Sequence, residues 1–229
     1  MSIRAYRAKN EFAVFKLLPG VARFGAPTMG GARAKGGTRF NVFLRQSDID
    51  GACGQHCALM ALLGLRVFSR GMLQDGGRSN WHALRVLARG KKYHFSGTEA
   101  ATLKWLLAPL SPRIASQPLK GRHTEVSDFA LDQLSRQRYV VLGIANSRAQ
   151  FLHWVLAVGL AGGERKGEFT PEAVLVLDPQ GAPPGPVPWN ALVTLNANTP
   201  RGRLRWMVEH SGASYSVALT NALAIWREG

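Results

Sequence analysis

The stretch QSDIDGACGQHCALMALL, residues 46–63, contains both cysteines of the chain and is the most informative part of the sequence. Its first half is polar and punctuated by glycine, as in a loop, and its second half is apolar with leucines at helical spacing. This pattern predicts a largely buried helix over residues 54–65, directly after Cys53. The free N–H groups and the dipole of a helix N-terminus favour negative charge, and the thiolate is the reactive form of cysteine. We therefore interpret Cys53 as a nucleophile.

Cys57, four residues later, is the alternative nucleophile, although the apolar residues around it indicate burial. Two cysteines at the start of one helix are poorly placed for a disulfide, so we expect free thiols and a reducing compartment, or only short exposure to an oxidising one. His56 lies between them, but the spacing Cys-x2-His-Cys is not typical of a zinc site and no second pair of ligands follows. We predict no metal and no cofactor.

The composition is that of a globular protein, with 46% hydrophobic residues among 229, and the formal net charge is +15. A charge of this size attracts nucleic acid, anionic lipid or an acidic protein partner, and a scattered basic surface without a partner is the alternative. The nearest basic runs, residues 89–92 and 201–205, are short.

No apolar run reaches about 18 residues, so we expect no transmembrane segment. We expect a cytoplasmic protein, or one exported by a dedicated secretion system without a signal peptide.

The chain is predicted to consist of a basic, glycine-rich N-terminal extension, residues 1–45, and one folded domain, residues 46–229. Within the extension, residues 11–18 fit either a short helix or a strand, and residues 20–37 fit a flexible connector. Residues 39–44 are predicted to form a strand that leads into the loop before Cys53.

Helical periodicity comes first in the predicted domain, and strand periodicity follows it. Besides the first helix, apolar spacing predicts helices at residues 81–89 with Asn80 as N-cap, 96–107, and 128–137 with Ser127 as N-cap. Buried strands are predicted at residues 139–144, 151–159 and 173–178, with a turn over 162–171. The tail fits strands at 204–208 and 215–219, or a helix at 217–226. This order predicts an α+β fold with an antiparallel sheet.

A cysteine nucleophile needs a general base and a group that orients the base. His153 lies in the second predicted strand and Asp178 ends the third, just before Pro179. If these strands form an antiparallel hairpin, the imidazole faces the carboxylate. His153 then accepts the Cys53 proton and Asp178 holds the imidazole tautomer. The backbone N–H of Cys53 and the side-chain amide of Gln46 are the predicted oxyanion donors.

These elements together resemble the papain-like cysteine peptidases, above all the bacteriocin-processing double-glycine peptidases and their relatives. The similarity consists of Gln46 seven residues before the Cys53-Gly54 step, then the segments HWVLAVG, residues 153–159, and VLDPQG, residues 176–181. It spans roughly residues 46–190. The resemblance implies a helical half that carries the cysteine, packed on an antiparallel β-sheet half that carries the histidine and aspartate.

The function expected from this resemblance is a cysteine (thiol) peptidase acting on a protein or peptide substrate through a thioester acyl-enzyme. Export by a dedicated secretion system, the second option for its location, would make it a bacterial effector or toxin. The same triad also serves amide or isopeptide hydrolases and acyltransferases, so the triad alone does not choose among them. A different alternative is a non-catalytic binding module whose basic surface holds nucleic acid or an acidic partner.

Overall fold

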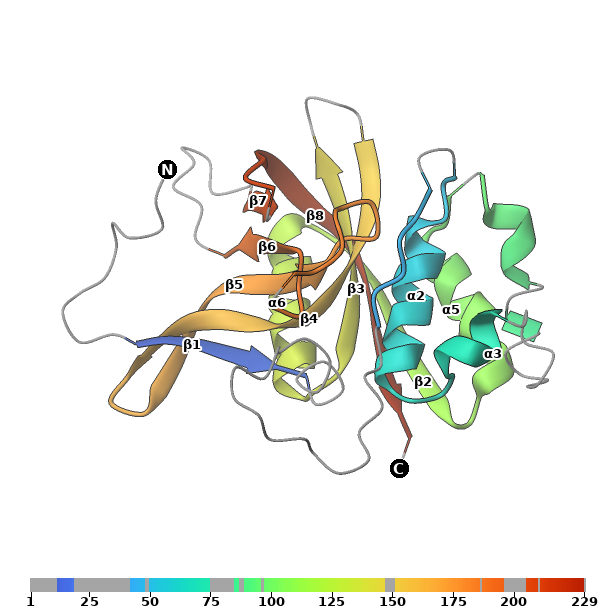
Figure 1. Ribbon diagram of the computed structural model, residues 1–229. Coiled ribbons are helices and arrows are strands. Elements are labelled where there is room, and N and C mark those ends of the chain that lie inside the picture. The colour runs from blue at the N-terminus through green and yellow to red at the C-terminus, as the bar shows by residue number, and fades with distance from the viewer. Residues whose placement is uncertain are drawn as a thin grey trace, which may run out of the picture.

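The structure is a computed structural model that describes residues 12–18, 42–47, 50–74, 85–86, 89–95, 97–146, 151–185, 187–195, 205–209 and 211–228. It is an α+β fold in which most helices lie to one side of an antiparallel sheet (Figure 1). The described helices are α2 (Cys53–Gly64), α3 (Arg70–Gln74), α5 (Ala100–Leu107) and α6 (His123–Ser135), with the short 3-10 helices η2 (Lys91–Tyr93) and η3 (Ala108–Leu110).

The sheet has eight described strands: β1 (Phe12–Leu17), β2 (Ile114–Lys120), β3 (Tyr139–Asn146), β4 (Phe151–Arg165), β5 (Glu168–Leu177), β6 (Ala191–Thr194), β7 (Arg205–Glu209) and β8 (Ser214–Arg227). All pairings are antiparallel, and β3 to β8 close into a ring because β4 pairs with both β3 and β5. β1 and β2 are added outside this ring, on β4 and β8.

Helix α2 packs against β3 and β4, whereas α6 packs against β8, β3 and β4 and lies behind the sheet in Figure 1. Strands that are covered on both faces consist of consecutive apolar residues. This explains why β3 and the middle of β4 are almost entirely hydrophobic. One hydrophobic core therefore runs through both halves of the domain, and it fixes α2 against the strand that carries His153.

The predicted helices differ from the observed ones mainly at their N-termini. Helix α5 begins at Ala100, four residues after the predicted start, and α6 begins at His123, before the predicted N-cap Ser127. Ser127 lies inside α6 and is buried. The N-terminus of α6 is instead held by the Glu125 carboxylate, which accepts a hydrogen bond from the backbone N–H of Arg122 at 2.8 Å. The predicted helix at 81–89 is described only at 85–86 and 89, which are helical, and its predicted N-cap Asn80 lies outside the described residues.

The strand predictions at 139–144, 151–159 and 173–178 correspond to β3, β4 and β5, and β4 and β5 form the predicted antiparallel hairpin. The broad turn predicted over 162–171 is wrong. Both strands continue to a tight turn at Lys166 and Gly167, whose positive φ angles of 52° and 82° reverse the chain there.

Two further expectations are corrected by the structure. Residues 42–44 are not a strand, and residues 39–41 of that prediction lie outside the described part. The alternative helix at 217–226 is wrong because β8 pairs there with both β2 and β3. In the predicted extension, residues 12–17 form a strand on β4, while the predicted connector at 20–37 is outside the described residues. Among the helices that are described, none is long and apolar enough to cross a membrane.

Candidate active site

Cys53 is the first residue of α2, as the sequence predicts within one residue. Ala52 is the N-cap, and its side chain makes no capping hydrogen bond to the first N–H groups of the helix. The loop before it is fixed by the Asp50 carboxylate, which accepts hydrogen bonds from the Ser47 backbone N–H at 3.0 Å, the Ser47 hydroxyl at 2.7 Å and the Ala52 N–H at 3.0 Å. Burial alone raises the pKa of Asp50, but these hydrogen bonds outweigh burial and hold that pKa below its usual value. The loop is thus anchored by a carboxylate that stays ionised.

His153 and Asp178 form the contact that the predicted hairpin requires. In the β4–β5 ladder Leu156 pairs with Leu177, which places the start of β4 beside the residue that follows β5. The Nε2 atom of His153 lies 2.6 Å from Oδ1 of Asp178. Both residues are only 3% exposed, so this hydrogen bond is shielded from water and strengthened by the low local dielectric.

The surroundings of His153 favour its protonated form. Burial by itself disfavours the imidazolium and lowers the pKa, but the hydrogen bonds with Asp178 and Cys53 and the charges of these two groups outweigh burial. The net effect raises the pKa of His153 from 6.5 to about 9. Because Nε2 faces Asp178, the other ring nitrogen is the one left for the Cys53 thiol. The imidazole is therefore held between a carboxylate and a thiol.

Cys57 occupies a different environment from Cys53. It is fully buried, and its thiol donates a hydrogen bond to the backbone carbonyl of Trp154 at 3.3 Å. Burial, together with the nearby Cys53 and Asp178, raises the pKa of Cys57 well above its ordinary value. Cys57 is accordingly a structural thiol that ties α2 to β4, and of the two cysteines only Cys53 contacts the imidazole.

Gln46 lies next to the aspartate of the site. Its backbone N–H donates a hydrogen bond to the carbonyl of Pro179 at 2.8 Å, directly after Asp178. Its side-chain amide donates to the carbonyl of Asp50, in the loop that leads to Cys53. An amide nitrogen carries two hydrogens, so one of them is left for another acceptor. Gln46 is thus brought to the same part of the molecule as the other three predicted site residues.

Asn190, a residue that the sequence pattern does not mark, is buried and holds the aspartate turn. Its Oδ1 accepts from the backbone N–H of Asp178 at 2.7 Å, and its Nδ2 donates to the carbonyls of Asp178 and Ala182, both at 2.8 Å. The Gln180 N–H also donates to Oδ1 of Asp178 at 2.8 Å. These bonds fix both the backbone and the carboxylate of Asp178. No local motif marks Asn190, because it acts across twelve residues of a proline-rich loop.

Trp154 joins the two halves of the domain beside the site, a role that its sequence position does not reveal either. Its indole N–H donates to the carbonyl of Thr98 at 2.8 Å, in the helical half. The indole lies against Gly54 and Gly143: a Cβ atom at Gly54 comes within 3.0 Å of Trp154 Cδ1, and one at Gly143 within 3.2 Å of Cζ3. The glycine after Cys53 therefore leaves room first for the Thr98 hydroxyl, which a Cβ would meet most closely, and then for this ring.

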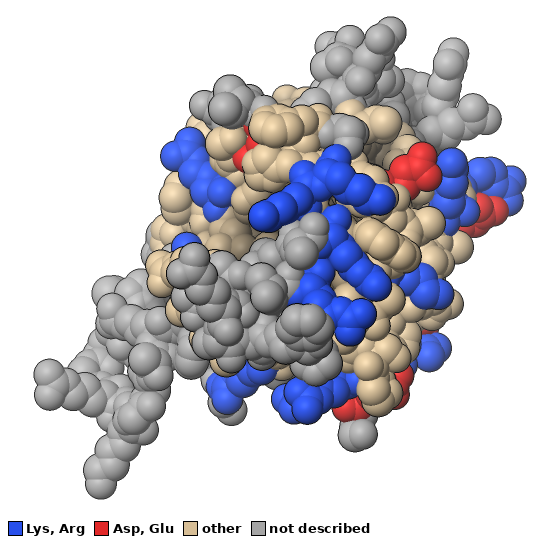
Figure 2. Space-filling view, turned by 90° about the vertical axis from the view of Figure 1, so that its right-hand side faces the viewer, with Lys and Arg blue, Asp and Glu red and all other residues tan. Residues whose placement is uncertain are grey.

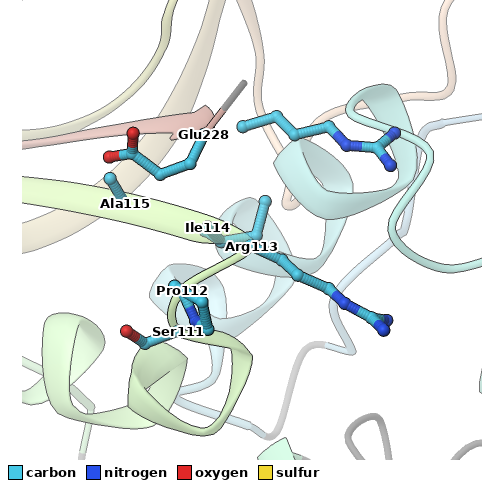
Figure 3. A pocket seen from close by; sticks show the side chains of 7 residues that line it. Ser111, Pro112, Arg113, Ile114, Ala115 and Glu228 are labelled. Carbon is cyan, nitrogen blue, oxygen red and sulfur yellow. The ribbon is translucent and has the colours of Figure 1, made fainter.

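A separate hollow of about 640 Å³ is lined by residues of the β2 and β8 ends: Ser111, Pro112, Arg113, Ile114, Ala115, Arg227 and Glu228 (Figure 3). It is distant from the triad. His153 on β4 is paired with Ile144 on β3, and Ile144 is paired in turn with Leu219 on β8. The hollow lies at Arg227, eight residues further along β8, which corresponds to about 26 Å of extended strand. This hollow is therefore separate from the Cys53, His153 and Asp178 cluster.

Within the described residues, no group of three His, Cys, Asp or Glu side chains is arranged to hold a metal ion. Nδ1 of His56, which lies between the cysteines, is 2.9 Å from the carbonyl of Ala52. No protein-family model and no curated protein matches the chain.

Proposed function

We propose that this chain is a papain-like cysteine hydrolase, and specifically a peptidase that cleaves peptide bonds in a protein or peptide substrate. The observation that carries the proposal is the hydrogen-bonded series Cys53–His153–Asp178, with the histidine and aspartate 2.6 Å apart and the thiol at the N-terminus of α2. Nucleophile, base and orienting group are the three parts that covalent acyl transfer needs.

The reaction follows from these positions. The Cys53 sulfur, with its proton on His153, attacks the carbonyl carbon of the scissile bond and forms a C–S bond. The imidazolium, whose pKa of about 9 keeps it protonated at neutral pH, donates its proton to the leaving nitrogen as the C–N bond breaks. Water then attacks the thioester carbon while the neutral His153 takes a proton from it, and the C–S bond breaks to release the acid product and the Cys53 thiolate.

The tetrahedral intermediate needs donors for its oxyanion, and two are supplied from different segments. The N–H of Cys53 belongs to the uncapped first turn of α2, where the helix dipole also favours negative charge. The second amide hydrogen of Gln46 is the other donor in this proposal. The hydrogen bond from the Ala52 N–H to Asp50 fixes the loop directly before Cys53. The backbone bond from Gln46 to Pro179 fixes Gln46 beside Asp178.

The peptidase proposal is tested by comparing new protein N-termini in a lysate treated with the wild type, Cys53→Ala or Cys57→Ala. We expect the wild type and Cys57→Ala to produce one common set of N-termini, and Cys53→Ala to produce none of them. The Cys57 variant is the matched control because it also removes one buried thiol from α2. If the wild type produces no new N-termini, peptide-bond cleavage is refuted, and an amide or isopeptide hydrolase with the same triad takes its place.

A further inference from the structure

Charge is distributed unevenly over the domain. Between residues 42 and 113, the described part of the helical half has nine Lys and Arg residues and two acidic ones. From residue 114 to 228, the described part has eight basic and nine acidic residues. Figure 2 looks onto the helical side, where Lys and Arg gather across the centre and acidic side chains lie towards the edges. Such a surface has a net attraction for a polyanion.

Four cations of this side, Arg89, Lys91, Lys92 and Lys104, form what we call the basic cluster. The Arg89 guanidinium lies 4.6 Å from the centre of the Trp105 ring and donates to the Trp105 carbonyl at 3.0 Å. The Lys92 ammonium lies 5.0 Å from the same ring, and Lys104 directly precedes Trp105 in α5. In the part of the chain that the structure describes, no carboxylate forms an ion pair with these four side chains. Their charges are available to an external partner.

Aromatic side chains are interleaved with these cations. Trp105 is 42% exposed and Phe95, in the same short segment as Lys91 and Lys92, is 75% exposed. Tyr93 meets the Trp105 ring edge-on, with centroids 6.4 Å apart. Exposed aromatic rings beside unpaired cations suit single-stranded nucleic acid, because bases stack on the rings while phosphates meet the cations. An acidic polypeptide uses only the cations.

We propose that this surface binds single-stranded nucleic acid, with the basic cluster on the phosphates and Phe95 as the stacking surface. This binding is separate from the proposed hydrolase activity, since none of these residues belongs to the triad. The backbone N–H of Gly51 donates to the carbonyl of His94 at 2.8 Å, so the segment with the cluster adjoins the loop before Cys53. The nucleic-acid site therefore lies beside the candidate active site without overlapping its catalytic groups.

The test uses the full chain with Cys53→Ala, so that binding is measured without hydrolysis. Fluorescence anisotropy with a labelled oligothymidine of about 20 nucleotides gives the affinity between about 50 and 200 mM salt. We expect the triple variant Lys91→Ala/Lys92→Ala/Lys104→Ala to reduce the steepness of the slope of log affinity against log salt by about 2, since three phosphate contacts are lost. The matched control Lys120→Ala/Arg165→Ala/Lys166→Ala removes the same charge from exposed positions outside the helical half and is expected to keep the wild-type slope.

Two further variants separate charge from stacking. We expect Phe95→Ala to weaken binding about fivefold or more, because one stacked base is lost. The salt slope should not change, because all phosphate contacts remain. Replacing the three lysines by arginine should retain binding, which shows that the alanine variant fails through lost charge and not through misfolding. The proposal is overturned if the wild type does not bind at the lowest salt or if both triple-alanine variants lose the same affinity. It is also overturned if polyglutamate or anionic vesicles displace the oligonucleotide at lower concentration than unlabelled oligothymidine does.

Discussion

The raised pKa of His153 gives a prediction that follows directly from the geometry of the site. In the wild type this imidazole is expected to titrate at about 9, because its bonds to Asp178 and Cys53 outweigh its burial. Asp178→Asn removes the carboxylate charge and the acceptor 2.6 Å from Nε2, while burial remains. The pKa of His153 should therefore fall clearly below its wild-type value in the variant, because only the contact with Cys53 is left to oppose burial.

The same shift has a consequence for stability. A change of pKa from 6.5 to about 9 corresponds to about 3 kcal/mol in favour of the folded state, present below pH 6.5 and lost as the pH rises through about 9. The free energy of unfolding of the wild type should therefore decline over this window. Asp178→Asn should show a smaller decline, because it loses the Asp178 contribution to this pKa. The proposed peptidase activity of the wild type should also fall above about pH 9, because the imidazolium that protonates the leaving group is lost. The rate of that activity should be about ten-thousand-fold lower in Asp178→Asn.

The assay is NMR of histidine-labelled protein, in which one of six imidazole signals is assigned through His153→Gln. The matched control is Asp132→Asn, which removes an exposed carboxylate that pairs with Arg136 at 2.9 Å and lies away from the site. It should leave the His153 titration unchanged. The reasoning is refuted if His153 of the wild type titrates near 6.5, or if Asp178→Asn and Asp132→Asn have the same effect on it.

Two further substitutions test the packing around the triad. Gly54→Ala puts a methyl group against Thr98 and within 3.0 Å of Trp154, and should lower the free energy of unfolding by about 1–3 kcal/mol in denaturant titrations. Gly185→Ala, which has no atom within 4 Å of the added carbon, is its control, and equal effects of the two variants contradict the packing argument. Asn190→Ala removes three hydrogen bonds at the aspartate turn and should lower the free energy of unfolding by about 2–4 kcal/mol in denaturant titrations. It should also lower the rate of peptide hydrolysis. A variant with wild-type stability and rate excludes this positioning role.

The parts of the site that could be predicted are those determined by local pattern. The polar loop and the apolar helix after Cys53 place the thiol at a helix N-terminus, and the structure has it there within one residue. The hairpin of two apolar strands requires His153 and Asp178 to face each other, and the structure has them in contact. The burial of Cys57 also follows from the apolar residues around it. Each of these inferences needs only the spacing of side chains along one element or one hairpin.

The parts that could not be predicted depend on contacts between distant segments. The residues of β8 fit either a helix or a strand by their own propensities, and pairing with β2 and β3 decides for the strand. Asn190 and Trp154 act through hydrogen bonds to carbonyls twelve and 56 residues away, which no periodicity marks. The start of α6 was misplaced because Ser127 resembles an N-cap, whereas the Glu125 carboxylate secures the helix a turn earlier.

The central claim, that Cys53 is a nucleophile activated by His153, is tested most directly by alkylation with iodoacetamide at about pH 6, where an ordinary thiol is almost entirely protonated. Peptide mass spectrometry follows the labelling of Cys53 and Cys57 separately in the wild type and in His153→Ala. We predict that Cys53 of the wild type is labelled much faster than free cysteine, that Cys57 is not labelled in the folded protein, and that His153→Ala reduces Cys53 to the rate of free cysteine or below. Labelling of Cys53 at the rate of free cysteine in the wild type, or at an undiminished rate in His153→Ala, contradicts the account.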